Sequence, residues 1–152
     1  MGRGGMTARI HLVPSTESSE QLKANSWSQV YPLRSPARGM VGFNFDRNDN
    51  QLLSITFYYA RFCLPRKYSD NSEYFVADEP SETRAMYDGW LLFIDLADIR
   101  GPKNLMSQFI ELREPASGTV ILDYLPDATI RSIEILGFSS RSAPIDQDAP
   151  QA

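Results

Sequence analysis

Cysteine and histidine are scarce in this chain, and their scarcity excludes several kinds of chemistry. Among 152 residues there is one of each, Cys63 and His11. A single cysteine cannot form an internal disulfide, and one cysteine with one histidine cannot supply the ligands of a usual structural zinc site. Glycine-rich phosphate-binding loops are also missing, because the glycines at residues 2–5 precede any expected strand. We therefore expect no metal and no other cofactor.

Long apolar runs and basic runs are missing too. No apolar stretch reaches the 18 or so residues of a membrane-spanning helix, and residues 1–6 lead into no apolar signal core. The net charge is −4, without a basic cluster, which argues against binding to nucleic acid or to an anionic membrane. We expect a cytoplasmic protein in a reducing compartment, with Met6 as an alternative start to Met1.

The chain does contain enough apolar material for one core, and a series of strand-like segments. Hydrophobic residues make up 42% of it and aromatics 11%, and this length fits one domain. We expect that domain at residues 7–138, with a flexible N-terminus at residues 1–6 and a disordered tail at residues 139–152. Strands are predicted at residues 7–13, 40–45, 52–64, 74–77, 90–96, 120–124 and 130–136.

The longest predicted strand, residues 52–64, anchors the expected sheet. Leu53, Ile55 and Phe57 form its more apolar face by simple alternation. The alternation slips near Tyr59, which predicts a bulge or bend there. Residues 90–96 are apolar on both faces, so we predict a central strand that is covered on both sides.

Two segments carry helical signals. A short helix is predicted at residues 19–24, and residues 103–114 are the best helix candidate, with a strand at residues 107–112 as the rival interpretation. The predicted fold class is mainly β: an antiparallel β-sandwich or a small β-barrel with one or two short helices. The alternative is an α+β fold in which the helix at residues 103–114 packs across one face of a sheet.

Two predicted hairpins, residues 44–57 and 123–135, are alike. Each begins with an Asp or Asn followed by an aromatic residue, continues through a turn, and resumes with Ser-Ile. An internal duplication and simple convergence of hairpin patterns both account for this. Residues 120–136 also resemble the closing hairpin of a widespread family of short bacterial proteins of unknown function, although Ser132 replaces a glycine and Pro126 stands in the turn. The resemblance covers about an eighth of the chain and implies no activity.

Carboxylates are the remaining candidates for chemistry. Asp95 is the only charge in residues 90–96, and Arg61 is the only charge in residues 52–64. We predict them as a catalytic pair that lines a cavity, because a buried carboxylate needs a partner or a proton. Aromatic residues with polar tips orient small ligands, and the candidates are Tyr58, Tyr59, Trp90 and Tyr124. The alternative places both charges in solvent at strand ends and the aromatic residues in the core.

Two functions stay open at this stage. The first is a small binding or interaction protein of unknown ligand, such as an accessory subunit or an inhibitor-like or immunity-like protein. The second is a cofactor-free small β-barrel enzyme, an isomerase, cyclase or hydrolase that uses a buried carboxylate and tyrosines in a cavity. The expected partner is a small molecule or another protein, including a second copy of the chain. A cavity at Asp95 would favour the enzyme, and a flat apolar patch would favour the interaction protein.

Overall fold

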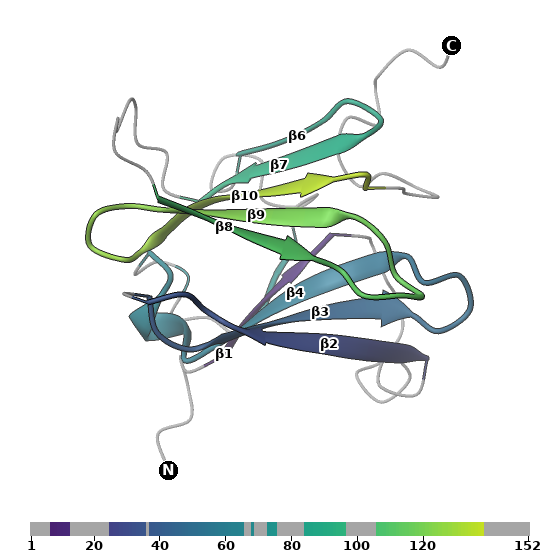
Figure 1. Ribbon diagram of the computed structural model, residues 1–152, viewed down its shortest axis with the longest axis horizontal. Coiled ribbons are helices and arrows are strands. Elements are labelled where there is room, and N and C mark those ends of the chain that lie inside the picture. Colours follow the sequence, from purple (N-terminus) through teal and green to yellow (C-terminus); the bar gives the residue numbers. More distant parts are fainter. Residues whose placement is uncertain are drawn as a thin grey trace.

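The protein is a sandwich of two β-sheets, which lie one above the other in Figure 1. The computed structural model describes residues 7–12, 25–35, 37–65, 68, 73–75, 84–96 and 106–138. The predicted mainly β sandwich is confirmed. Within the residues described, the two sheets stay separate and do not close on each other, so the barrel alternative is wrong.

Sheet A comes mostly from the first half of the chain. Across the sheet its strands are β2 (Ser26–Pro32), β3 (Met40–Asp46), β4 (Leu52–Tyr58), β1 (Thr7–His11) and β5 (Glu73–Phe75). The first four pair antiparallel, and the short β5 runs parallel to β1 at the edge. The predicted bend is present: β4 ends at Tyr58, Tyr59 has a left-handed backbone (φ 62°), and the 3₁₀ turn η1 (Ala60–Phe62) follows.

Sheet B is antiparallel throughout. Across the sheet its strands are β6 (Arg84–Tyr87), β7 (Leu91–Asp95), β10 (Ile130–Leu136), β9 (Thr119–Tyr124) and β8 (Met106–Glu111). The helix predicted at residues 103–114 is wrong, because residues 106–111 are the edge strand β8. The α+β alternative, which needed that helix, is wrong as well. No helix in the described part of the chain is long and apolar enough to cross a membrane.

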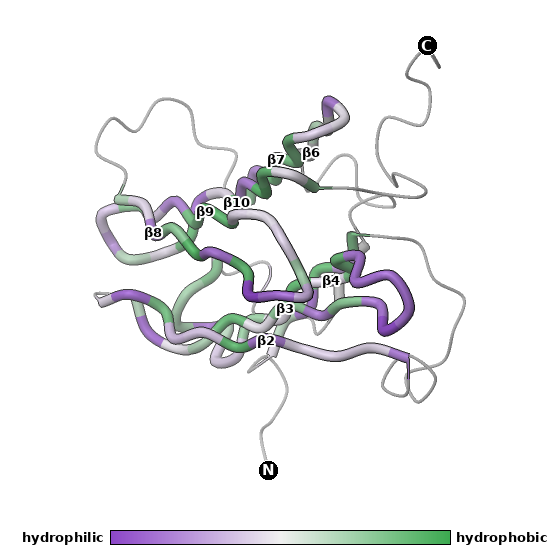
Figure 2. The backbone as a smooth tube through the Cα atoms, turned by 45° about the vertical axis from the view of Figure 1, so that its right-hand side comes forward, coloured by the Kyte–Doolittle hydropathy of each residue, from purple (hydrophilic) through white to green (hydrophobic). Residues whose placement is uncertain are grey.

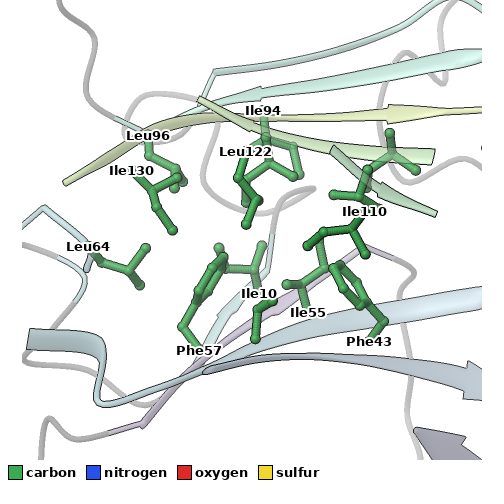
Figure 3. Packing of buried hydrophobic residues seen from close by; sticks show 14 of the residues in the cluster. Ile10, Phe43, Ile55, Phe57, Leu64, Ile94, Leu96, Ile110, Leu122 and Ile130 are labelled. Atoms are coloured by element: carbon green, nitrogen blue, oxygen red, sulfur yellow. The ribbon is translucent and has the colours of Figure 1, made fainter. Parts of the chain in front are cut away.

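The core lies between the two sheets. Figure 3 shows Ile10, Phe43, Ile55 and Phe57 of sheet A pointing toward Ile94, Leu122 and Ile130 of sheet B. Alternation along each strand sends these side chains inward and their sequence neighbours outward. Each fully buried Leu, Ile or Phe contributes roughly 1.5–3 kcal/mol, so this interlayer contact is the main source of stability.

Several predictions fall on residues outside those described. These are the predicted flexibility of residues 1–6, the short helix predicted at residues 19–24, the disordered tail predicted at residues 139–152 and the end of the strand predicted at residues 74–77.

The two sheets are built on the same four-strand topology. β1 to β4 are arranged as β2-β3-β4-β1, and β7 to β10 are arranged as β8-β9-β10-β7. Each central hairpin carries a register shift beside its turn. In one, Asn44 pairs with Ser54 but Phe45 pairs with Leu52, and in the other, Asp123 pairs with Ser132 but Tyr124 pairs with Ile130. Matching bonds join the flanking strands: the Leu12 NH donates to Leu53 O, and the Leu96 NH donates to Arg131 O, both at 2.8 Å.

The sequence carries the same repeat, with an offset of 79 residues. Eight of the 14 positions from Ser28 to Val41 hold the same residue at the equivalent position of the second repeat. The identical pairs are Ser28 and Ser107, Gln29 and Gln108, Leu33 and Leu112, Arg34 and Arg113, Pro36 and Pro115, Ala37 and Ala116, Gly39 and Gly118, and Val41 and Val120. Topology, hydrogen bonds and residue identities therefore agree on an internal duplication.

The two repeats brace each other at one edge of the sandwich. Gln29 of β2 donates from Nε2 to Arg113 O (2.6 Å) and accepts from the Arg113 NH (2.9 Å). Gln108 of β8 makes the equivalent contact with the first repeat: its Oε1 accepts from the Arg34 NH (2.8 Å), and its Nε2 donates to Pro32 O (3.1 Å). Because Arg34 and Arg113 are equivalent positions, this reciprocity means that an approximate two-fold axis relates the repeats.

Candidate functional site

The predicted catalytic pair is divided between two places. Asp95 ends β7 on the outer face of sheet B, where it is 8% exposed, and its carboxylate lies 4.0 Å from the guanidinium of Arg131. Arg61 is an exposed residue of η1, so Arg131 holds the position beside Asp95 that we expected for Arg61. The catalytic roles assigned to Asp95 and Arg61 stay predictions.

The four predicted ligand-binding aromatics do not converge. Tyr58 lies on the outer face of sheet A, where its ring is next to Gly42. Tyr124 is buried in the core and donates its hydroxyl hydrogen to Gln108 Oε1 (2.7 Å). Tyr59 and Trp90 are both more than half exposed, Tyr59 after β4 and Trp90 before β7. Their binding roles also stay predictions.

A polar row crosses the outer face of sheet B beside Asp95. The strand register aligns Asp95, Ser132, Asp123 and Ser107 on four neighbouring strands. Asp123 accepts hydrogen bonds from Ser107 Oγ (2.7 Å) and from Ser132 Oγ (2.9 Å). Asp95, Asp123 and Ser132 are all buried although they point away from the core. In the described part of the chain no group of His, Cys, Asp or Glu side chains is arranged to hold a metal ion.

Glu134 stands next to this row and is perturbed by it. It lies two residues beyond Ser132 on β10, on the same face, which makes it a diagonal neighbour of Asp123. Partial burial raises the pKa of Glu134 to about 7, and a hydrogen bond and charge repulsion with Asp123 add to the rise. Two carboxyl groups that share a hydrogen bond must hold a proton between them.

An apolar row runs parallel to the polar one, and we call it the apolar row of sheet B. By register it crosses all five strands as Met86, Phe93, Glu134, Ile121 and Phe109. Strands lie about 4.8 Å apart, so the row is roughly 19 Å long. Met86 is 69% exposed and Phe109 is 66% exposed, while Phe93 and Ile121 are half-buried. The prediction that both faces of residues 90–96 are covered is therefore wrong for the outer face.

The equivalent row on sheet A is different in character. The duplication matches Phe93, Glu134, Ile121 and Phe109 with Arg9, Thr56, Gly42 and Val30. There, Arg9 Nε donates to Thr56 Oγ1 (3.2 Å), and the next row is linked through Asn44, which accepts from Ser28 Oγ (2.7 Å) and donates to Ser54 Oγ (2.8 Å). At equivalent positions, sheet A thus carries Arg9 hydrogen-bonded to Thr56, whereas sheet B carries Phe93 beside Glu134.

A cavity of about 290 Å³ opens at one end of the sandwich. It lies where the β3–β4 turn, the β8–β9 turn and the end of β10 come together, at the right of Figure 1. Figure 2 shows the β3–β4 turn as a hydrophilic purple loop. The lining residues are Phe45, Asp49, Asn50, Gln51, Leu52, Leu112, Pro115, Ser117, Ile135, Gly137 and Phe138. None of the predicted site residues is among them.

Cys63 is a core residue in this structure. It is buried, it contacts Tyr59 O through Sγ (3.8 Å), and burial raises the pKa of its thiol to about 12. A thiol with so high a pKa is protonated at neutral pH and is a poor nucleophile.

No protein-family model, no curated protein and no solved structure matches this chain. The likeness of residues 120–136 to a bacterial family therefore stays a resemblance, and the geometry of the two faces and the cavity carries the functional argument.

Local sequence patterns predict neither the apolar row nor the cavity. The helix predicted at residues 103–114 is inconsistent with the row, because in such a helix Phe109 would face the core. The repeated Ser-Gln at residues 28–29 and 107–108 was the available signal, because aligning the repeats places Phe109 opposite Val30 on an outer face.

Proposed function

We propose that the protein is a protein-binding module that docks its partner on the apolar row of sheet B. The observation that carries this proposal is the contrast between the two outer faces of one duplicated scaffold. Arg9 and Gly42 on sheet A are replaced by Phe93 and Ile121 at the equivalent positions of sheet B. Exposed apolar side chains that gather on one face are typical of interaction sites.

The proposed interface has enough apolar surface to drive binding. Met86 and Phe109 lie at the two ends of the row and are both mostly exposed. Burying each of them against a partner would contribute roughly 1.5–3 kcal/mol. Aromatic residues and methionine are enriched in protein interfaces because they offer a large contact area.

The partner should carry a cation within an apolar surface. Glu134 interrupts the apolar row at its centre, and Asp123 lies beside it. A Lys or Arg of the partner opposite Glu134 would compensate the carboxylate when water is displaced from the interface. A partner without such a group would have to bind Glu134 in its protonated form.

Site-specific photo-crosslinking tests the proposal with a matched control. A benzoylphenylalanine replaces Phe109 in one variant and Val30, its equivalent on sheet A, in the other. We expect a discrete crosslinked species in cells from position 109 and not from position 30. Mass spectrometry of the crosslinked peptide identifies the partner residue in contact.

Equal crosslinking from both positions, or none from position 109, would contradict the proposal. A crosslinked species at twice the mass of the chain would mean that the docking face is correct but that it binds a second copy of the chain and not a different, cation-bearing partner. The enzymatic alternative gains no support from the cavity, since neither Asp95 nor Arg61 lines it.

A further inference from the structure

The two ends of the sandwich are equivalent by the two-fold relation, yet among the described residues one end is filled and the other holds a cavity. Near the β9–β10 turn, the chain that follows β4 packs into the end of the sandwich. Ala60, Cys63, Leu64 and Tyr68 are all buried there. We call residues 60–68 the plug, of which 60–65 and 68 are described. Figure 1 shows η1, which begins the plug, at the left, opposite the end that holds the cavity.

Contacts of the plug identify the surface that it covers. Cys63 O accepts a hydrogen bond from the Ile130 NH (2.8 Å). Cys63 also lies near the phenol of Tyr124. Burial raises the pKa of that phenol to about 12, and Cys63 adds a smaller contribution to the rise. The guanidinium of Arg38 lies 5.0 Å from the centre of the Phe62 ring. The plug therefore packs against Tyr124 and Ile130 and contacts the exposed Arg38.

The cavity is lined by the equivalents of those three residues. Tyr124, Ile130 and Arg38 correspond to Phe45, Leu52 and Ser117, all of which line the cavity. The chain also leaves both central strands in the same way, because Tyr59 after β4 and Gly137 after β10 have left-handed φ angles of 62° and 77°. The cavity thus occupies the position that the plug fills at the other end.

We propose that this cavity binds a short peptide segment of a partner protein that resembles the plug: a leucine-sized apolar side chain with basic residues close by. The apolar requirement follows from Phe45, Leu52, Leu112, Ile135 and Phe138 in the lining. The basic requirement follows from Asp49, the one charged residue in the described part of the lining, and the sequence of the plug supplies Arg61, Arg66 and Lys67 around Leu64. This site is separate from the apolar row of sheet B.

Two pairs of equivalent residues make sharp controls. Asp49 Oδ1 accepts from the Gln51 NH (3.0 Å), and Asp127 Oδ1 accepts from the Thr129 NH (2.9 Å), so both aspartates stabilise the turn in the same way. Only Asp49 lines the cavity. Ser117 and Arg38 are likewise equivalent and exposed, one at each end.

The test measures fluorescence anisotropy of a labelled synthetic peptide with the sequence of residues 59–69, titrated with the full chain in reducing buffer. We expect micromolar binding that Ser117→Trp weakens about tenfold or more by filling the cavity, while Arg38→Trp leaves the affinity unchanged. Asp49→Asn should weaken binding severalfold and reduce its salt dependence, and Asp127→Asn should do neither.

Absence of binding at millimolar chain, or an affinity that Ser117→Trp leaves unchanged, would overturn the inference. Loss of binding in Phe109→Asp would also overturn it, because the peptide would then occupy the outer face of sheet B. The crosslinking experiment at position 109 tests the apolar row of sheet B, and the peptide titration tests the cavity. Either proposal can therefore fail while the other stands.

Discussion

Glu134 occupies the centre of the apolar row and is its one ionisable side chain. Among the described residues, Asp123 on β9 and Asp95 on β7 are its diagonal neighbours on the same face, and Arg131 of its own strand lies beside Asp95. Arg131 lies beside Asp95, whereas Glu134 meets Asp123, so repulsion prevails at Glu134. Its protonation near neutral pH makes stability depend on pH, and the docking that we propose would share this dependence.

Stability should fall as Glu134 ionises. Its pKa is raised from 4.5 to about 7 in the folded chain, so the folded state binds more protons than the unfolded state between these values. The free energy of unfolding therefore decreases as pH rises through this window. We expect Glu134→Gln to have a higher melting temperature than the natural chain at pH 8 and the same melting temperature at pH 5, measured by circular dichroism.

An Asp123→Asn background is the control for this prediction. Without the neighbouring carboxyl the pKa of Glu134 is less raised, so the gain from Glu134→Gln at pH 8 should shrink. A melting-temperature difference that is the same at pH 5 and pH 8 would contradict the prediction.

At the scale of elements, the turns that join β2 to β3 and β8 to β9 explain why the repeat is preserved in sequence. The Leu33 NH donates to Gly39 O, and the Leu112 NH donates to Gly118 O, both at 3.0 Å. Both glycines have positive φ, 112° and 120°. A Cβ would lie 2.6 Å from Tyr58 O at Gly39 and 2.9 Å from Leu136 O at Gly118, so only glycine fits either turn.

Gly118→Ala should therefore be costly. The strained backbone alone costs roughly 1–3 kcal/mol, and the contact with Leu136 O adds to it. Gly89→Ala, also at positive φ (100°) but with nothing within 4 Å of the new Cβ, isolates the backbone strain. We expect Gly118→Ala to lose more free energy of unfolding than Gly89→Ala in urea titrations. An equal loss would contradict this, because it would show that the chain shifts enough to remove the close contact between the new Cβ and Leu136 O.

At the scale of the whole molecule, the reciprocal glutamines hold the two repeats together at one edge. Both sheets could pack their apolar faces without a fixed mutual position, because hydrophobic contact is not directional. The hydrogen bonds of Gln29 and Gln108 are directional, and each one reaches backbone groups of the other repeat. They define how the two sheets are aligned.

Gln29→Ala should destabilise the fold by roughly 1–3 kcal/mol, because it leaves the NH and the carbonyl oxygen of Arg113 without their partner. Gln108→Ala should cost less, since Gln108 is only half-buried whereas Gln29 is buried. Chemical denaturation measures both values. Val30→Ala, an outward-facing neighbour on β2, is the control and should change stability by less than about 0.5 kcal/mol. A Gln29→Ala loss as small as that of Val30→Ala would contradict the bracing role.

Local patterns predicted much of the fold and little of the candidate sites. Alternation along residues 52–58 and the slip near Tyr59 predicted β4 and the bend after it. Phe109 shows the limit of the same method: an apolar side chain exposed on a surface imitates the spacing of a helix, because the pattern records hydrophobicity and not what covers it. Asp95 was correctly singled out as an unusual charge, but its neighbour Arg131 comes from β10, which no local pattern links to β7.

The sequence by itself determined which residues share a strand face and where turns occur, because these features depend on backbone geometry within a few residues. Only the tertiary structure decided which face of each sheet is covered, which carboxyl groups meet, and that among the described residues one end of the sandwich is filled while the other holds a cavity. These depend on contacts between different strands and different sheets, such as Gln29 with Arg113, which are 84 positions apart, and the free energy of such contacts exists only once both sheets have formed.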